Sequence, residues 1–241
     1  MKVIFFDLGS TLIYAKDPWA EFFRLGDAAL LRALRHAGLP LVGETFHAEN
    51  GTFIDRYYAQ YMPTDTTERT AFSVLREILA EKGYRNVPDP ILRAALDALY
   101  AVTNRNWYAE EDALPTLAAL RDAGYRLGLI SNTSDDAHVQ DLVDRNGFRP
   151  YFESVTTSAG LGIRKPDRRI FQAALDHFRV PPAAAAMVGD MLEADVLGAN
   201  GMGMYSIWIT RRAASGPDPA IVPQATVAAL HEIPPLLASL K

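Results

Sequence analysis

Residues 3–14, VIFFDLGSTLIY, decide the fold because they join an apolar run to a carboxylate and a small polar turn. The run from Val3 to Phe6 is continuously apolar, which is typical of a strand in a parallel sheet that is covered on both faces. Asp7 follows at once, and Gly9 lies in the turn that comes next. Asp, Gly and Ser are ordinary strand terminators, so this stretch alone fits both a structural turn and a catalytic one.

Similar apolar runs recur along the chain and alternate with amphipathic segments. The predicted further strands are residues 125–131, 152–158, 185–190 and 204–210. The predicted helices between and after them are residues 114–123, 135–146, 167–178, 192–200 and 227–240. This alternation predicts an α/β fold with a doubly wound parallel sheet. Ligands bind such sheets beyond the carboxyl ends of the strands, where Asp7, Ser131, Asn132 and Asp190 are expected.

The segment between the first two strands does not follow this alternation. Residues 15–108 contain no predicted strand but several amphipathic helical patterns, among them residues 19–38 and 67–83, each closed by a glycine. A crossover connection needs far fewer residues. We therefore predict an inserted all-α domain at 15–108, and an α/β core made of residues 1–14 and 109–241.

Composition narrows the class of protein. The chain has 241 residues, of which 49% are hydrophobic, and a formal net charge of −5, with Lys and Arg scattered along it. A nucleic-acid partner is not expected from this distribution. The absence of cysteine excludes disulfides, thiolate nucleophiles and cysteine-ligated zinc. No signal segment and no apolar run of about 18 residues occur, so we expect a cytoplasmic protein without a membrane partner.

The polar strand ends suggest a phosphate and metal site. Lys165 is followed by Pro166 at a predicted helix start, and its ammonium group suits a phosphate or a carboxylate. Asp190 and Asp195 flank the start of the next helix. Carboxylates that converge on one edge of a sheet repel each other unless a cation lies among them, and hard oxygen ligands suit Mg²⁺.

The segments FFDLGSTL, LISN, RKP and GDMLEAD occur in this order along the chain. In order and spacing they resemble the motifs of the haloacid dehalogenase (HAD) superfamily, in the subfamily with a helical cap inserted between the first two motifs. The resemblance covers essentially the whole chain. It implies a Rossmann-like core with a helical cap, and a Mg²⁺-dependent phosphatase that acts on a small phosphorylated metabolite.

The resemblance also implies a role for individual residues. Asp7 is the expected nucleophile, which forms an aspartyl-phosphate, and Ser131 and Lys165 are the expected partners of the transferring phosphoryl group. The expected phosphate- or substrate-binding residues are Ser10, Thr11, Tyr14, Ser131, Asn132 and Lys165. The expected metal-site residues are Asp7, Gly9 through its carbonyl, Asp190 and Asp195, the last through water or by orienting Lys165.

Gly9 departs from the family pattern. Phosphatases of this family usually carry a second Asp at this position, which protonates the leaving oxygen and later activates water. A substrate whose leaving group needs no acid, an acid from the inserted domain such as His47 or Asp17, or a chain of waters would each compensate. Gly9 also keeps two other functions open, a 2-haloacid dehalogenase and a weakened protein that binds a phosphorylated ligand. Trp19, Tyr57, Tyr58 and Tyr61 of the inserted domain either line a pocket or pack between helices.

Overall fold

The computed structural model describes residues 1–40, 53, 65–214 and 216–240. Within these residues the chain divides into two compact units, one made of Met1–Tyr14 and Tyr108–Lys241 and the other of Ala15–Trp107. Tyr108 thus belongs to the first unit, although the sequence pattern places it at the end of the inserted segment.

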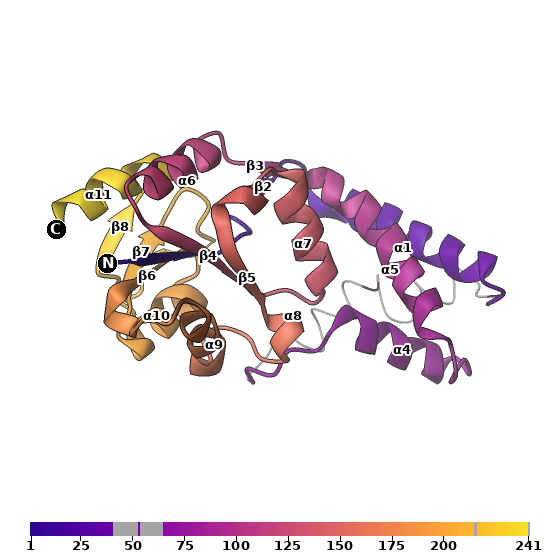
Figure 1. The fold of residues 1–241 in the computed structure, drawn as a ribbon. Helices are drawn as coiled ribbons and strands as arrows, with labels where there is room; N and C mark the ends of the chain where they lie inside the picture. The colour runs from indigo at the N-terminus through magenta and orange to yellow at the C-terminus, as the bar shows by residue number, and fades with distance from the viewer. Residues whose placement is uncertain (41–52, 54–64, 215, 241) are drawn as a thin grey trace. The chain divides into compact units, whose positions relative to one another are not determined.

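A six-stranded parallel sheet forms the centre of the first unit (Figure 1). Its strands are, in spatial order, β5 (Phe152–Thr157), β4 (Arg126–Ser131), β1 (Val3–Phe6), β6 (Ala185–Gly189), β7 (Tyr205–Ile209) and β8 (Ala225–Val227). The central strands consist of apolar residues that are almost fully buried, as the sequence predicts for strands covered on both faces. The predicted α/β fold with a parallel sheet is confirmed.

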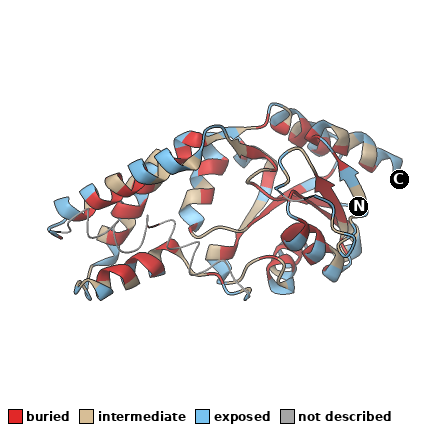
Figure 2. Cartoon of the chain, turned by 180° about the vertical axis from the view of Figure 1, so that it is seen from behind, coloured by how far each residue is buried: buried red, intermediate tan, exposed pale blue. Residues whose placement is uncertain are grey.

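Helices cover both faces of this sheet (Figure 1). Those of the first unit are α6 (Ala113–Asp122), α7 (Asp136–Arg145), α8 (Ser158–Leu161), α9 (Arg168–Phe178), α10 (Leu197–Met202) and α11 (Ile233–Ser239). Side-chain caps begin three of them: Asp135 accepts a hydrogen bond from the backbone N–H of His138, Thr157 accepts one from that of Gly160, and Asp167 accepts one from that of Arg169. Figure 2 shows the buried residues concentrated in the strands and on one side of the helices.

The core on the α9 face depends on close contact between β1, β4 and α9. The rings of Phe5 and Phe178 meet edge to face, with their centroids 5.2 Å apart. Gly128 of β4 lies beside both rings, and a Cβ atom there would stand 2.7 Å from Phe5 Cε1. A side chain at this position would displace the Phe5 ring. The close packing of the two rings therefore requires glycine in this strand.

Two predicted helices differ from the structure at their starts. Residues 192–200 are not one α-helix, because Leu192–Val196 form a π-helical turn before α10 begins at Leu197. The last predicted helix, 227–240, begins too early: Ala225–Val227 pair with β7 as β8, and α11 starts at Ile233 after a short turn. The start of the predicted helix pairs with β7 through backbone hydrogen bonds, so it forms a strand although its sequence pattern is helical.

Helices are the main elements of the second unit over the residues that the structure describes. Its helices are α1 (Trp19–His36), α4 (Ala71–Glu81) and α5 (Asp89–Thr103). They share an apolar cluster that includes Leu34, Leu75 and Leu96. The glycines expected at the helix ends adopt left-handed backbone, with φ of 90° at Gly38 and 93° at Gly83.

A short two-stranded sheet, which the sequence pattern does not predict, lies where the chain passes between the units. It pairs β2 (Ile13–Ala15) with β3 (Trp107–Ala109). The expectation that no strand occurs in 15–108 is therefore wrong at both ends of that segment. Strands of this length carry too few residues to show an alternation pattern.

Candidate active site

Parallel pairing brings the predicted polar residues to one edge of the sheet. Phe6 pairs with Leu129 of β4 and with Val188 of β6, so all three strands end at nearly the same level. Asp7 follows β1, Ser131 ends β4 and Asp190 follows β6. The three residues therefore lie at the carboxyl edge, where sheets of this kind bind ligands.

The loop after β1 is a tight turn built around the carbonyl of Leu8, which accepts hydrogen bonds from the N–H groups of Leu12 and Ile13 at 2.9 and 3.0 Å. Ser10, and not Gly9, takes the left-handed conformation in this turn, with φ of 59°. Thr11 Oγ1 lies 3.4 Å from Asp190 Oδ1, to which it donates. Thr11, which lies in the small polar stretch after Asp7, thus contacts Asp190, the acid that follows the neighbouring strand.

Lys165 is the charged centre of the cluster. Its Nζ donates to Asp7 Oδ1 at 2.6 Å, to Asp195 Oδ1 at 2.7 Å and to the carbonyl of Ile130 at 2.7 Å. Burial lowers the pKa of Lys165, but the Asp195 and Asp7 carboxylates outweigh it and hold that pKa above its ordinary value. The side chain is 2% exposed and that of Asp7 is 12% exposed, so Asp7 is the member of the pair that solvent reaches.

Asn132 is hydrogen-bonded to the main chain of Lys165. The side-chain amide donates to the main-chain carbonyl of Lys165 at 3.1 Å and accepts from its N–H at 2.8 Å. The sequence pattern places Asn132 among the phosphate-binding residues. In the structure the oxygen and the nitrogen of the side-chain amide both hydrogen-bond to the main chain of Lys165.

Asp7, Asp190 and Asp195 form the acidic part of the site, with one carboxylate oxygen of each within 4.8 Å of the others. Burial, with the nearby Asp7 and Asp195 carboxylates, raises the pKa of Asp190 to about 8. Burial also raises the pKa of Asp7 to about 6, against the opposing effect of Lys165. A single ammonium group therefore leaves part of the negative charge of this cluster uncompensated.

This donor set fits a divalent cation. The ligands are hard carboxylate oxygens, and burial together with repulsion from the neighbouring carboxylates disfavours the ionised forms of Asp7 and Asp190, which a cation would stabilise. Asp195 is the least available of the three acids, because its Oδ1 accepts from Lys165 and its Oδ2 accepts from the N–H of Met191 at 3.0 Å.

Comparison with known proteins decides the family. The family model described as haloacid dehalogenase-like hydrolase matches residues 1–203. The chain belongs to the haloacid dehalogenase-like hydrolases. It is therefore an enzyme of the hydrolase class, as the order of its motifs predicts.

Several relatives of this hydrolase are named as phosphatases. It is 30% identical over 219 residues to glyceraldehyde 3-phosphate phosphatase of Methanothermobacter thermautotrophicus, covering 87% of this chain and 85% of that protein. It is 36% identical over 217 residues to phosphoserine phosphatase of Thermus thermophilus, covering 90% and 76%. Among solved structures it resembles 2-haloacid dehalogenase from Pseudomonas syringae pv. Tomato DC3000, with a TM-score of 0.72, 26% identity and all of both chains covered.

Tyr14 of the hydrolase packs against an aromatic ring and a guanidinium group within the first unit. Its ring centroid is 6.2 Å from that of Tyr108, and the Arg212 guanidinium lies 4.1 Å from the ring centroid. Arg212 also pairs with Glu110, which is 2.8 Å away. The sequence pattern places Tyr14 among the substrate-binding residues, whereas the contacts present here are packing and cation–π contacts.

Gly189 is a site residue that sequence reasoning missed. A Cβ atom there would stand 2.1 Å from Asp195 Oδ2, so only glycine lets Asp195 approach the end of β6. The signal was present in the sequence as a glycine directly before Asp190 at the end of an apolar strand. Trp208 of β7 was missed as well: its indole N–H donates to the Asp190 carbonyl at 2.8 Å.

The structure describes some of the candidate residues of the inserted domain and not others. Trp19 stacks on Phe23 with centroids 5.1 Å apart and also contacts Trp107, so it packs between elements of the second unit. The backbone N–H of Asp17 donates to the side-chain carbonyl of Asn106 at 2.8 Å. The remaining candidates lie outside the described residues: His47, Tyr57, Tyr58 and Tyr61.

Proposed function

We propose that this hydrolase is a Mg²⁺-dependent phosphatase of a small phosphorylated metabolite and works through an aspartyl-phosphate at Asp7. The observation that carries the proposal is the geometry of Asp7, which is partly open to solvent, fixed by Lys165 and flanked by two further acids. The names of the relatives support phosphoryl transfer.

Each residue has a chemical task in this proposal. The Asp7 carboxylate attacks phosphorus, the bond from phosphorus to the leaving oxygen breaks, and water then hydrolyses the aspartyl-phosphate to phosphate and free Asp7. Lys165 reduces the repulsion between the carboxylate and the incoming phosphate. The buried Ser131 hydroxyl at the end of β4 donates to a phosphoryl oxygen.

Asp7, the carbonyl of Gly9 and Asp190 are the proposed holders of Mg²⁺. When bound, the ion supplies a positive charge that polarises the phosphoryl oxygens. Asp195 takes a different role, because Lys165 and the N–H of Met191 occupy its oxygens. We assign Asp195 to the orientation of Lys165.

Gly9 limits the substrates that this site hydrolyses well. The glycine supplies a main-chain carbonyl but no carboxylic acid, so the leaving oxygen gets no proton from position 9. Leaving groups that depart as stable anions, such as carboxylates from acyl phosphates or nitrophenolate, need no such proton. We therefore propose that acyl and aryl phosphates are hydrolysed faster than alkyl phosphates.

A panel of sugar, nucleotide, aryl and acyl phosphates, assayed with Mg²⁺ and with EDTA, tests the function. We expect phosphate release that needs Mg²⁺ and is lost in Asp7→Asn, whose amide is nearly isosteric but not nucleophilic. Binding of phosphorylated ligands without any turnover across the panel would contradict the proposal and favour a binding protein.

A 2-haloacid dehalogenase is the second candidate. It is favoured by Gly9, since dehalogenases of the family also lack the second Asp, and by the likeness to a solved 2-haloacid dehalogenase. The acids at 190 and 195 count against it, because dehalogenases need no metal. Halide release from 2-halopropionate in the presence of EDTA would establish this activity in place of the phosphatase.

A further inference from the structure

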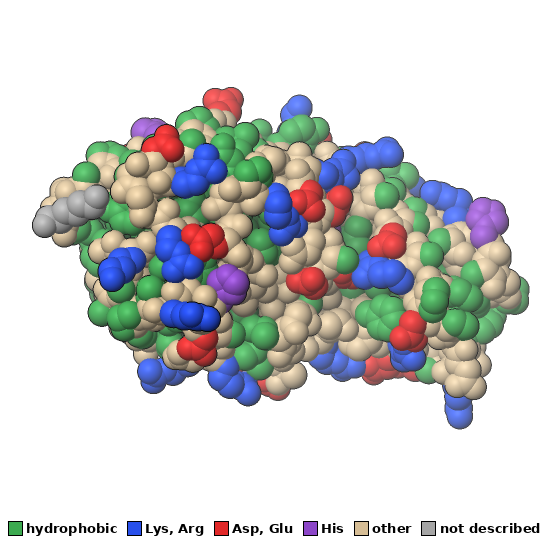
Figure 3. All heavy atoms as spheres, viewed as in Figure 1, with side chains coloured by type: hydrophobic (Ala, Val, Ile, Leu, Met, Phe, Trp, Pro, Cys, Tyr) green, Lys and Arg blue, Asp and Glu red, His purple; other side chains and the backbone are tan. Residues whose placement is uncertain are grey.

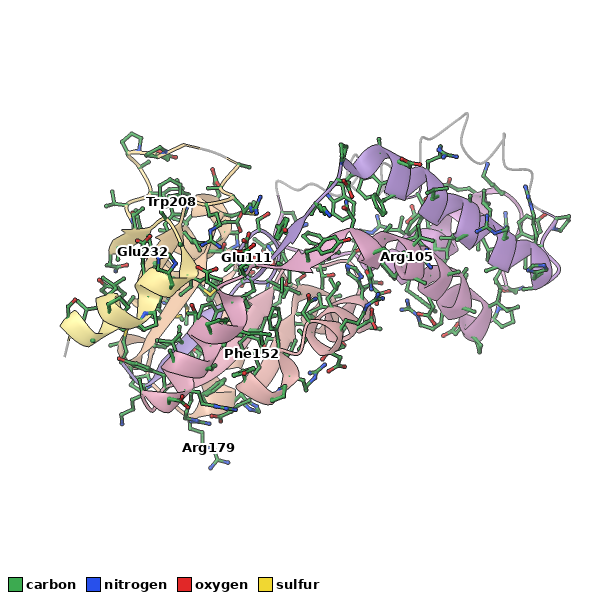
Figure 4. The ribbon with its side chains drawn as sticks, turned by 90° about the horizontal axis from the view of Figure 1, so that it is seen from above. Arg105, Glu111, Phe152, Arg179, Trp208 and Glu232 are labelled. Atoms are coloured by element: carbon green, nitrogen blue, oxygen red, sulfur yellow. The ribbon has the colours of Figure 1, made fainter. Side chains whose placement is uncertain are left out.

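Trp208 is a buried aromatic residue next to the acidic cluster, in a part of the sheet that supplies none of the proposed catalytic residues. It lies on β7, pairs with Gly189 of β6 and is 6% exposed. Figure 4 labels it among the side chains of the first unit. Trp208 therefore lies beside Asp190, the residue that follows β6.

The indole nitrogen has a specific partner. Trp208 Nε1 donates to the main-chain carbonyl of Asp190 at 2.8 Å, in a buried hydrogen bond. Asp190 lies just past the end of β6, where the pairing of β6 with β1 and β7 stops at the preceding residues. The side chain of a neighbouring strand therefore fixes the peptide unit that carries this acid.

The indole ring also packs on the turn that carries the third acid. Trp208 forms an apolar cluster with Leu192 and Val196, with Ala213 and Ile221 against it. Leu192–Val196 is the π-helical turn that contains Asp195. Single π-helical turns of this kind are rare and occur frequently at functional sites.

We propose that Trp208 is a positioning residue that holds Asp190 in the arrangement that binds the divalent cation, and holds the turn of Asp195 in the arrangement that orients Lys165. The inference rests on the proposed metal-dependent function. Residues behind metal ligands orient them, and their loss typically weakens metal binding or activity by about 10- to 100-fold. Trp208 acts in two ways, by hydrogen bonding to one acid's main chain and by packing against the other acid's turn.

Trp208→Phe tests this role because it keeps an aromatic ring but removes the donor. We expect the Mg²⁺ dissociation constant, measured by calorimetry without substrate, to rise by about tenfold. The kcat of the variant should recover at saturating Mg²⁺ and the KM for the phosphorylated substrate should stay unchanged. A general loss of packing would lower kcat at every Mg²⁺ concentration.

Trp107→Phe is the matched control, since it makes the same chemical change at a ring that packs against Trp19 in the second unit. Its Mg²⁺ affinity should equal that of the wild type. An unchanged Mg²⁺ affinity in a folded Trp208→Phe protein would overturn the inference while leaving the phosphatase intact. Absence of Mg²⁺ binding by the wild type would instead overturn the proposed function on which it rests.

A measurement on the wild-type side chain covers the case in which Trp208→Phe does not fold. The chain has three tryptophans, so the indole N–H resonance of Trp208 can be assigned by elimination from Trp19→Phe and Trp107→Phe. We expect this resonance to shift on titration with Mg²⁺ alone. A Trp208 resonance that stays in place at saturating Mg²⁺ would contradict the coupling.

Discussion

At the scale of single residues, the sequence identifies which groups gather at the site but not which of them touch. Asp7, Ser131 and Asp190 follow from their positions after buried strands. The pairing of Asn132 with Lys165 does not, because it joins a strand end to a segment far along the chain. The packing of Tyr14 against Arg212 escapes sequence analysis for the same reason.

Gly9→Asp tests whether a missing acid limits the chemistry. Gly9 is not among the residues with positive φ, and the left-handed residue of the turn is Ser10, so a side chain at position 9 meets no penalty from φ. We expect turnover of alkyl phosphates to rise by about tenfold, a part of the usual acid–base contribution. Rates for p-nitrophenyl phosphate should change much less.

Gly9→Asn is the control, because it has nearly the same size and supplies no acid. Steady-state rates are plotted against the leaving-group pKa for the wild type and both variants, and the slopes of the three plots are compared. An unchanged slope in a folded, Mg²⁺-binding Gly9→Asp protein would mean that another group already transfers the proton, and His47 and Asp17 are the next to change.

The acids of the site also predict how Mg²⁺ binding depends on pH. The pKa of Asp190 is raised to about 8 and that of Asp7 to about 6, so protons compete with the cation at neutral pH. We expect the apparent Mg²⁺ affinity to increase from pH 6 to pH 8, by up to about tenfold per pH unit for each proton released.

Calorimetry in buffers of different ionisation enthalpy measures this proton release directly. Asp190→Asn should bind Mg²⁺ weakly and with a flatter pH dependence. A wild-type affinity that is the same at both ends of this range would contradict the raised pKa values.

At the scale of elements, periodicity predicts most strands and helices of the first unit because long apolar runs and amphipathic patterns are local features. Short elements that depend on a partner escape it, as β2, β3 and β8 show. The π-helical turn at Leu192–Val196 is also invisible to a helical pattern, since it arises where Asp195 reaches back to the N–H of Met191.

Gly189→Ala tests the contact between β6 and this turn. Its Cβ atom would meet Asp195 Oδ2 at 2.1 Å, so Asp195, which accepts a hydrogen bond from Lys165, or the end of β6 must shift. We expect a loss of about 1–3 kcal/mol in the free energy of unfolding. We also expect kcat to fall by about 100-fold, because a shift of about 1 Å in the residue that orients Lys165 misplaces the lysine.

Gly201→Ala is the matched control, because a Cβ atom there has no neighbour within 4 Å and the residue lies in α10. It should leave kcat unchanged and stabilise the protein by up to about 1 kcal/mol. Urea denaturation and steady-state kinetics measure both variants. Wild-type activity in Gly189→Ala would show that the position of Asp195 is not critical.

At the scale of the whole molecule, the chain consists of an α/β unit and a second unit whose described part is mainly helical. Charges of both signs are interspersed over the face shown in Figure 3. None of the described helices has the length and apolar character that crossing a membrane requires. The cytoplasmic location and the roles of the two units as catalytic core and cap stay predictions.

A charged network after β7 makes the stability of the first unit depend on pH. Arg211 contacts both oxygens of Asp112 at 2.7 Å, and the N–H of His231 donates to Asp112 at 3.1 Å. Burial raises the pKa of Asp112, but Arg211 and His231 outweigh it and depress that pKa far below its ordinary value. The resulting stabilisation is full above the unfolded pKa of about 3.9 and is lost as the pH falls through the folded pKa.

Asp112→Asn should therefore lower the free energy of unfolding by about 1–2 kcal/mol at neutral pH. The difference from the wild type should shrink as the pH falls from about 4 toward 2. Urea denaturation across this range checks the sign, with Asp122→Asn at an exposed position of α6 as the control. A difference that grows on acidification would contradict the account.

Covalent trapping at Asp7 tests the central claim most directly. The purified protein is mixed with Mg²⁺ and an acyl or aryl phosphate, quenched in acid within one turnover, and digested for mass spectrometry. The account predicts one added phosphoryl group on the peptide that contains Asp7, and none in Asp7→Asn. Turnover that proceeds with the phosphoryl group on another residue, or with no covalent phosphoryl group at any time, would contradict it.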